Sequence, residues 1–232
     1  MKILSIECSA SPVSAAITEN GSIISSAFSN TKVTHSETLM PTVNAVLKFA
    51  RLTLSDIDGF AVAAGPGSFT GVRIGIAAVK GMAASTASPC AGVSTLEAMA
   101  HLQAGVSGII CPVMDARRNQ VYNALFKYEN GRICRLCEDR AISCADLAAE
   151  IAKAGVSVTV CGDGTDVFIP FTGNLTNVTA ADAAHRFQNA TGVAAAAERL
   201  FAEGKTVTPD KLLPVYLRMP QAERELKEKL AK

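Results

Sequence analysis

Residues 59–86 read GFAVAAGPGSFTGVRIGIAAVKGMAAST and predict a strand, a glycine turn and a helix, in that order. The strand is expected over residues 60–64, and Gly65-Pro66-Gly67 forms the turn. Ser68 is expected to cap the helix, because a serine hydroxyl accepts hydrogen bonds from the free N–H groups of a first turn. Such N–H groups can also hold a phosphate. The segment therefore fits an anion site as well as a purely structural turn.

The helix expected over residues 70–86 has almost no polar side. Only Arg73 and Lys80 carry charge within it. A helix that is apolar all round must be covered on more than one side. Small residues, which let a second backbone come close, recur four apart, at Gly71 and Gly75 and at Ala77 and Gly81. Periodicity by itself supports two interpretations equally: a core helix of this chain, or a surface for a partner.

Composition indicates a globular intracellular chain. It has 232 residues, 49% of them hydrophobic, which is enough for one large domain or two smaller ones. A net charge of +1 creates no field that would attract nucleic acid or an anionic membrane. Seven cysteines without a disulfide-like spacing, and no export signal at the start, predict reduced thiols and a cytoplasmic location. No uncharged apolar run reaches the roughly 20 residues of a membrane span.

The first half of the chain alternates strand-like and helix-like segments. Asn20-Gly21 is a hairpin signal between two of the strands. A boundary is expected at residues 105–108, which separates a lobe of residues 1–106 from a smaller lobe of residues 107–232. The expected strands are residues 2–7, 13–18 and 22–28, and the expected helices are residues 36–51 and 95–103.

The opening pattern recurs in the second half at a constant offset of 108 residues. Residues 3–17 fall on residues 111–125, within the stretch from Ile110 to Leu125, which places Glu7 on Asp115. In both halves an acidic residue ends one strand, and a second strand follows after a tight turn. Two related α/β lobes are therefore expected. Further elements are expected at residues 121–128, 132–138, 145–154, 157–161 and 191–203, with a charged tail at 223–232.

Four motifs stand out along the chain. They are HSETLMP at residues 35–41, GPGSFTGVRIG at 65–75, DARR at 115–118 leading to Val121-Tyr122, and PVYLR at 214–218. Together they resemble the bacterial TsaB (YeaZ-like) family, and they occur in the order and at the positions that are typical of that family. The resemblance implies a two-lobed α/β fold of the actin/Hsp70/sugar-kinase type, with a mixed sheet in each lobe.

The resemblance also implies a function. Family members are non-catalytic subunits in the synthesis of threonylcarbamoyladenosine in tRNA. They bind a TsaD-like transferase, a TsaE-like ATPase completes the assembly, and tRNA is reached indirectly through the complex. A homodimer is expected when the chain is isolated, and no membrane is involved.

In this family the helix starting near His35 and the helix at residues 70–86 pack against the partner. Carried over to this sequence, the expected interface includes small, apolar and charged residues of both helices. They are His35, Glu37, Leu39, Gly71, Val72, Arg73, Gly75, Ile76, Val79, Lys80 and Met82. The sharpest form of this expectation is that Gly75→Trp abolishes partner binding while the chain stays folded.

No metal site or catalytic residue is expected. The transferase lineage holds its metal with a His-x-x-x-His pair, whereas His35, His101 and His185 are isolated from one another. Cys134 and Cys137 form a Cys-x-x-Cys inside a strand, where two ordinary thiols are the simplest interpretation. Ser68 lacks the flanking glycines of a Gly-x-Ser-x-Gly nucleophile elbow.

A nucleotide site in this chain is expected to be degenerate. In the actin-like fold, one strand–turn–strand unit in each lobe cradles phosphate. The corresponding residues here are Glu7, Ser9, Asp115, Arg117, Gly162 and Gly164. Glu7 stands where the family more often has aspartate, and the turn after Asp115 carries bulky side chains instead of glycine. We expect no cofactor bound by this chain alone, and any ATP or ADP at the interface with the partner.

Two other functions remain open at this stage. One is an autonomous enzyme of the actin-like fold, either a nucleotide phosphohydrolase or kinase, or a peptidase. Steady ATP turnover by the purified chain, lost in Asp115→Ala, would identify it. The other is a free-standing regulatory homodimer that uses the apolar helix for self-association.

Overall fold

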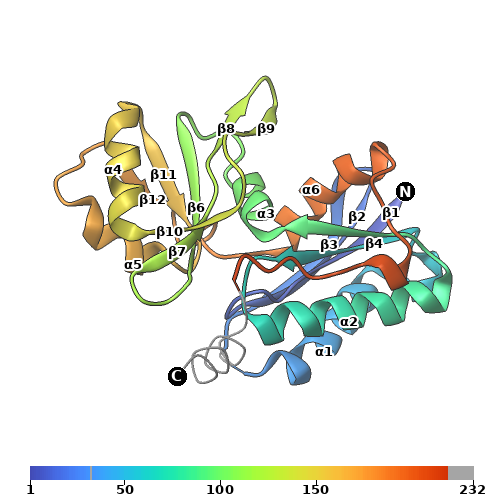
Figure 1. The fold of residues 1–232 in the computed structure, drawn as a ribbon. Helices are drawn as coiled ribbons and strands as arrows, with labels where there is room; N and C mark the ends of the chain where they lie inside the picture. The colour runs from blue at the N-terminus through green and yellow to red at the C-terminus, as the bar shows by residue number, and fades with distance from the viewer. Residues whose placement is uncertain (32, 219–232) are drawn as a thin grey trace, which may run out of the picture.

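The computed structural model describes residues 1–31 and 33–218, which form two lobes (Figure 1). In the first lobe, β1 pairs with β2 and β2 with β3 in antiparallel fashion, whereas β1, β4 and β5 run parallel. At the β2–β3 hairpin, Asn20 and Gly21 both have positive φ, as the predicted turn requires. The strand order is β3 (Ser22–Ser29), β2 (Val13–Glu19), β1 (Lys2–Glu7), β4 (Gly59–Gly65), β5 (Cys90–Ser94).

Helices cover both faces of this first sheet. The helices α1 (His35–Ala50) and α2 (Phe69–Thr86) bury their apolar sides on one face, where Leu4 and Phe60 are fully buried. On the other face, α6 (Ala190–Ala202) packs with Val193 against the sheet. The short helix α3 (Thr95–His101) contacts α6 and continues toward the second lobe. Because both faces are covered, β1 and β4 are apolar along nearly their whole length.

The second lobe is a smaller mixed sheet with β6 at its centre. A hairpin of β8 (Phe126–Glu129) and β9 (Arg132–Arg135) pairs with the beginning of β6. The helices α4 (Cys144–Ala154) and α5 (Thr165–Phe168) complete this lobe. The strand order is β10 (Arg140–Ser143), β7 (Gln120–Asn123), β6 (Ile109–Asp115), β11 (Val158–Cys161), β12 (Val178–Ala180).

The predicted internal repeat corresponds to the same pattern of strand pairing in the sheets of the two lobes. In each lobe the first strand pairs antiparallel with the next strand and parallel with a later one. Glu7 ends β1 opposite Ser14, and Asp115 ends β6 opposite Val121, so the two hairpins differ by one residue in register. One strand was expected over residues 121–128. The structure has two, β7 and β8, because residues 124–125 between them are not in a strand.

The chain enters the second lobe near the expected boundary and returns to the first lobe towards its end. The second lobe begins with β6 at Ile109, close to the expected residue 107. However, α6 and residues 205–218 return to the first lobe, where Val207 forms a bridge with Cys90 of β5. The range 107–232 is therefore not one lobe. The alanine-rich α6 presents no polar pattern that would assign it to one sheet rather than the other, so its place depends on packing.

The charged tail expected at residues 223–232 lies outside the described residues. Within residues 1–31 and 33–218, no helix combines the length and the apolar content that crossing a bilayer would need.

Candidate functional site

A cleft of about 530 Å³ lies between the two lobes. Its first-lobe wall consists of the loop after β1 and the N-terminal end of α2. Its second-lobe wall consists of the turn after β6, Tyr122 and Asp163, and the segment at residues 215–218 closes one side. Of the predicted nucleotide residues, the cleft is lined by Ser9, Asp115 and Arg117.

Glu7 lies fully buried at the end of β1, beneath this cleft. Its Oε1 accepts a hydrogen bond from the backbone N–H of Ser9 at 2.6 Å, and its Oε2 has no hydrogen-bond partner among the described residues. Burial raises the pKa of Glu7 to about 7, the hydrogen bond from the Ser9 backbone opposes that rise, and the nearby Asp163 adds to it. Burial also raises the pKa of Asp163. Burial thus makes the charged form of both carboxyl groups less favourable than in water, and of the two only Asp163 lines the cleft.

The turn between β6 and β7 is occupied by its own side chains. Arg117 forms an ion pair with Asp115 at 2.9 Å, and its backbone N–H donates to the same carboxylate at 2.7 Å. Arg117, Arg118 and Asn119 have φ values of 66°, 56° and 54°. Each non-glycine residue in that region costs about 1 kcal/mol or more. The expected crowding of this turn is therefore present, and Asp115 already has a cationic partner.

Gly162 and Gly164 support Asp163 instead of facing the cleft. The N–H of Gly162 donates to the carbonyl of Arg186 at 2.6 Å, and the N–H of Gly164 donates to Val113 at 3.1 Å. A Cβ at residue 164 would lie 2.8 Å from the backbone of Met114, so these glycines permit close packing on β6. Their expected role in a nucleotide site is not supported by this geometry. Asp163 between them, which the sequence interpretation missed, is the residue that reaches the cleft.

The expected partner face of α2 is instead the buried face of that helix. A Cβ at residue 75 would lie 2.7 Å from Cys8 Sγ and 3.1 Å from Val62, so the glycine lets α2 approach its own sheet. The other predicted small and apolar contacts share this burial. Gly71, Val72, Gly75, Ile76, Val79 and Met82 of α2, and Leu39 of α1, are all buried in the first lobe. In this fold side chains of the same chain cover these seven residues, and their contact with a partner stays a prediction.

The charged members of the predicted interface lie on the surface or at its margin. Arg73 stacks on the ring of Phe69 at 3.8 Å from its centroid and donates from Nε to Tyr216 Oη at 2.7 Å. Lys80 donates to the carbonyl of Asp210 at 3.1 Å. Glu37 is exposed at the beginning of α1.

Exposed small and apolar residues lie on the flanks of α1 and on the outer face of α2. Phe49 of α1 is 75% exposed and Met40 is 41% exposed. On α2, Ala77, Gly81 and Ala84 are exposed. The two helices lie next to each other on the same face of the sheet (Figure 1). We call these five residues the outer helix surface. The helical period that buries Leu39, Val43 and Val46 places Met40 and Phe49 on the two opposite flanks of α1, about 90° to either side of the buried stripe.

The remaining candidate residues have structural surroundings. Ser68 accepts a hydrogen bond from the N–H of Gly71 at 3.3 Å, which confirms the predicted N-cap. His35 contacts the carbonyl of Pro12 at 3.2 Å and lines the cleft. Cys137 accepts a hydrogen bond from the N–H of Leu125 at 3.2 Å. Across the described part of the chain, no group of three His, Cys, Asp or Glu side chains is arranged to hold a metal ion.

Comparisons with known proteins agree on one family. The family model described as TsaD, tRNA N6-adenosine threonylcarbamoyltransferase, matches residues 23–230. The "tRNA threonylcarbamoyladenosine biosynthesis protein TsaB" of Escherichia coli K12 is 32% identical over 97% of this chain and 98% of its own length. The protein of the same name from Bacillus subtilis 168 is 34% identical over 72% of this chain and 73% of its own length.

Solved structures give the same result. A crystal structure described as similar to peptidase YEAZ, from Pseudomonas aeruginosa, has a TM-score of 0.82 at 26% identity, and covers 94% of this chain and 99% of its own. A structure of YeaZ from the same organism has a TM-score of 0.81 at 25% identity, over 93% and 99% of the two chains. Together with the repeated sheets, these similarities confirm the expected two-lobed α/β fold with a mixed sheet in each lobe.

Proposed function

The chain belongs to the TsaB (YeaZ-like) family, and from this membership we propose that it is a non-catalytic subunit of a tRNA-modifying complex. The complex transfers a threonylcarbamoyl group to adenosine of tRNA. In this proposal the chain binds a TsaD-like transferase, a TsaE-like ATPase joins the assembly, and tRNA is reached through the complex. The observation that carries the proposal is the 32% identity to a TsaB protein over nearly the full length of both chains.

The outer helix surface is the proposed contact with the transferase. It comprises Met40, Phe49, Ala77, Gly81 and Ala84 and presents apolar and small side chains to solvent. Small residues on a helix permit close approach of a second helix, and an exposed aromatic residue is a frequent energetic centre of an interface. This chain also matches the TsaD family model itself, so the two proteins are related in sequence. A surface that fits a related partner also suits a second copy, and we propose a homodimer for the isolated chain.

The cleft supports a subunit without its own nucleotide chemistry. A phosphate placed beside the β6–β7 turn would compete with the Arg117–Asp115 ion pair. It would also lie close to Asp163, a carboxyl group whose pKa burial raises, so a second negative group beside it is unfavourable. We therefore propose that this chain alone holds no cofactor, and that any ATP or ADP binds at the interface with its partner.

Reconstitution tests the subunit role. Purified transferase, ATPase and threonylcarbamoyl donor are combined with unmodified tRNA, with and without this chain, and modified adenosine is measured by mass spectrometry. Modification should depend on the chain. Equal modification without it would overturn the proposal, and steady ATP hydrolysis by the chain alone, lost in Asp115→Ala, would favour the autonomous enzyme.

A matched pair of tryptophan substitutions tests the surface. Ala77→Trp places a large side chain on the outer face of α2, whereas Ala152→Trp places it on the exposed side of α4 in the other lobe. Affinity for the transferase is measured by calorimetry. We expect Ala77→Trp to weaken binding and Ala152→Trp to leave it unchanged. Equal affinities for both variants would remove the outer helix surface as the contact.

A further inference from the structure

The contact between the two lobes has an apolar centre. Leu96 and Met99 of α3 pack in one buried cluster with Ile110 of β6 and Phe126 of β8. All four side chains are at most 1% exposed. Lobes of one chain are expected to move relative to each other unless their interface is extensive and hydrophobic. A shared core of this kind resists such motion, because separating the lobes would expose these side chains to water.

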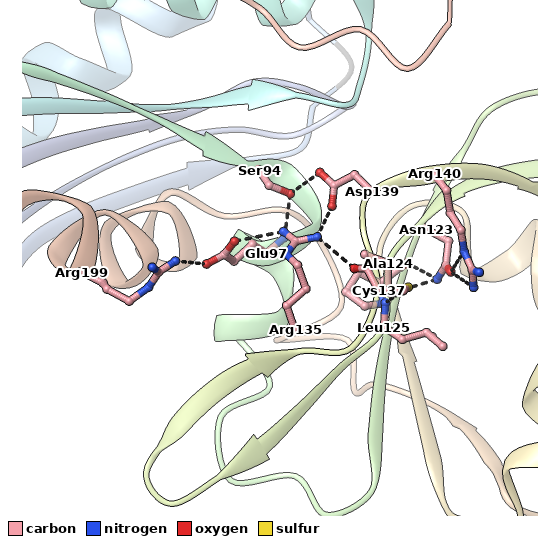
Figure 2. A network of polar contacts seen from close by, with 11 residues as sticks. Ser94, Glu97, Asn123, Ala124, Leu125, Arg135, Cys137, Asp139, Arg140 and Arg199 are labelled. Atoms are coloured by element: carbon pink, nitrogen blue, oxygen red, sulfur yellow. Dashed lines mark hydrogen bonds and ion pairs between the residues drawn. The ribbon is translucent and has the colours of Figure 1, made fainter. Parts of the chain in front are cut away.

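A network of ion pairs and hydrogen bonds connects the two lobes near β9 (Figure 2). Arg135 of β9 donates to Glu97 of α3 at 3.0 Å and also pairs with Asp139. Asp139 in turn accepts a hydrogen bond from Ser94 of the first lobe at 2.6 Å. Arg199 of α6 donates to the second oxygen of Glu97 at 2.8 Å. The network therefore joins both lobes and connects four elements, namely β5, α3, β9 and α6.

These charges are partly shielded from water. The side chains of Arg135, Glu97 and Asp139 are 24%, 19% and 15% exposed. Burial pushes the pKa of Glu97 up, but hydrogen bonds from Arg135 and Arg199 outweigh that effect and leave the pKa lowered. Ion pairs on the open surface contribute little, whereas removing one partner of a shielded pair leaves an uncompensated charge.

The segment of residues 212–218 connects the two lobes at the other end of their interface. The N–H of Val215 donates to the carbonyl of Ala64 in β4 at 2.8 Å. Tyr216 stacks on Phe69 at the beginning of α2, with ring centroids 4.9 Å apart. Arg218 then reaches the second lobe, where Nη1 donates to the carbonyl of Ala116 at 2.7 Å.

These two sets of contacts lie at opposite ends of the same strand, β6. The β8–β9 hairpin, which carries Arg135, pairs with the beginning of β6 at Ile109 and Ile110. Ala116, which Arg218 holds, directly follows the end of β6 at Asp115. A hinge rotation about either end would break the contact at the other end. The buried cluster lies between them.

We propose that the two lobes form a single rigid unit, locked by Arg135 at one end of β6 and by Arg218 at the other. Two-lobed enzymes commonly close over their substrates by hinge motion. In this chain the interlobe cleft keeps its width, and the lobes present one fixed composite surface. The inference concerns the free chain and does not depend on the identity of its partner.

Residual dipolar couplings of backbone amides in the free full-length chain test this inference, because they report the orientation and relative motion of the lobes. The variants are Arg135→Gln, Arg218→Gln and the double variant. Arg132→Gln, on the same strand, is the control, because Arg132 makes no ion pair within the described residues. Amide chemical shifts within each lobe confirm that the variants are folded.

In the wild type, both lobes should fit one alignment tensor in the orientation of this structure, with and without Mg·ATP. In the double variant the two lobes should no longer fit one tensor, and the tensor magnitude of the second lobe should be smaller. Arg132→Gln should behave as the wild type. If the double variant does not fold, the single variants must show the same loss to a lesser degree. Separate tensors in the wild type, a change of orientation with Mg·ATP, or an unchanged common tensor in the variants would each overturn the lock.

Discussion

Gly75 of α2 faces Cys8 of the first lobe so closely that a Cβ at residue 75 would lie 2.7 Å from the cysteine Sγ. Six residues further along the same helix, Gly81 has no atom within 4 Å of the equivalent position. The two glycines therefore mark the inner and outer faces of α2. Only the outer one is available to another molecule.

Alanine substitutions at these two glycines should have opposite effects on stability. Gly75→Ala forces the added methyl group against Cys8 and Val62, and overpacking of this kind costs about 1–3 kcal/mol. Gly81→Ala meets open space and should add about 0.5–1 kcal/mol, because alanine favours the helix. Urea denaturation followed by circular dichroism measures both. Stabilisation of the chain by Gly75→Ala would contradict the packing described here.

The carboxyl group of Glu7 should make stability fall as pH rises. Its pKa is about 7 in the folded protein against an ordinary value of 4.5, so between these values the folded state binds more protons than the unfolded state. Stability from this group is complete below pH 4.5 and is lost through pH 7, by about 3 kcal/mol in total.

Glu7→Gln should remove that slope, because glutamine stays neutral and its Oε1 can still accept the hydrogen bond from Ser9. At pH 8 the variant should be more stable than the wild type. The free energy of unfolding, measured between pH 4.5 and 8, checks this. Glu129→Gln, at an exposed ion pair with Lys127, is the control for removing one negative charge. Parallel pH profiles for wild type and Glu7→Gln would rule out a titrating Glu7.

Phe49→Asp should weaken binding of the transferase without unfolding the chain. The side chain is 75% exposed at the end of α1, so it contributes little to the core. If it lies at the centre of the partner contact, a charged replacement should lower the affinity by roughly tenfold or more. Val156→Asp, at a 45% exposed position in the second lobe, is the matched control. A similar affinity for both variants would place Phe49 outside the contact.

Thiol labelling should separate the seven cysteines into two groups. Cys134 and Cys137 are partly exposed, whereas the other five are buried. Burial raises the pKa of Cys111 to about 12 and that of Cys90 to about 11, which suppresses the reactive thiolate. Iodoacetamide should therefore modify Cys134 and Cys137 first, as located by peptide mass spectrometry. Labelling of Cys111 at the same rate in the native chain would contradict this arrangement, and urea-unfolded protein gives the reference rates.

The sequence predicted the central strand–turn–helix unit within one or two residues. The strand expected at residues 60–64 is β4, and the helix expected near residue 70 is α2, which begins at Phe69. The unit is readable because glycine and proline mark the turn locally and Ser68 caps the helix with its own hydroxyl. The repeat at an offset of 108 was also readable, since both halves end a strand with an acidic residue before a hairpin.

The exposed face of α2 could not be read in the same way. A helix with polar residues on one side shows in its sequence which side is buried, but α2 is small or apolar nearly all round. Gly75 and Gly81 are therefore indistinguishable in the sequence. Only the position of Cys8 on the neighbouring loop places one in the core and the other on the surface.

The sequence by itself determined the family, the two-lobed fold and the elements with strong local signals, because turns, caps and motifs depend on neighbouring residues. The tertiary structure alone decided the packing of α6 on the first lobe, the burial of Glu7 beside Asp163, and the joining of the lobes through Arg135 and Arg218. These features arise between residues about 40 to 190 positions apart in the chain. Contacts over such separations leave no periodic pattern, since they are selected by the burial of apolar surface and the pairing of charges in the folded chain.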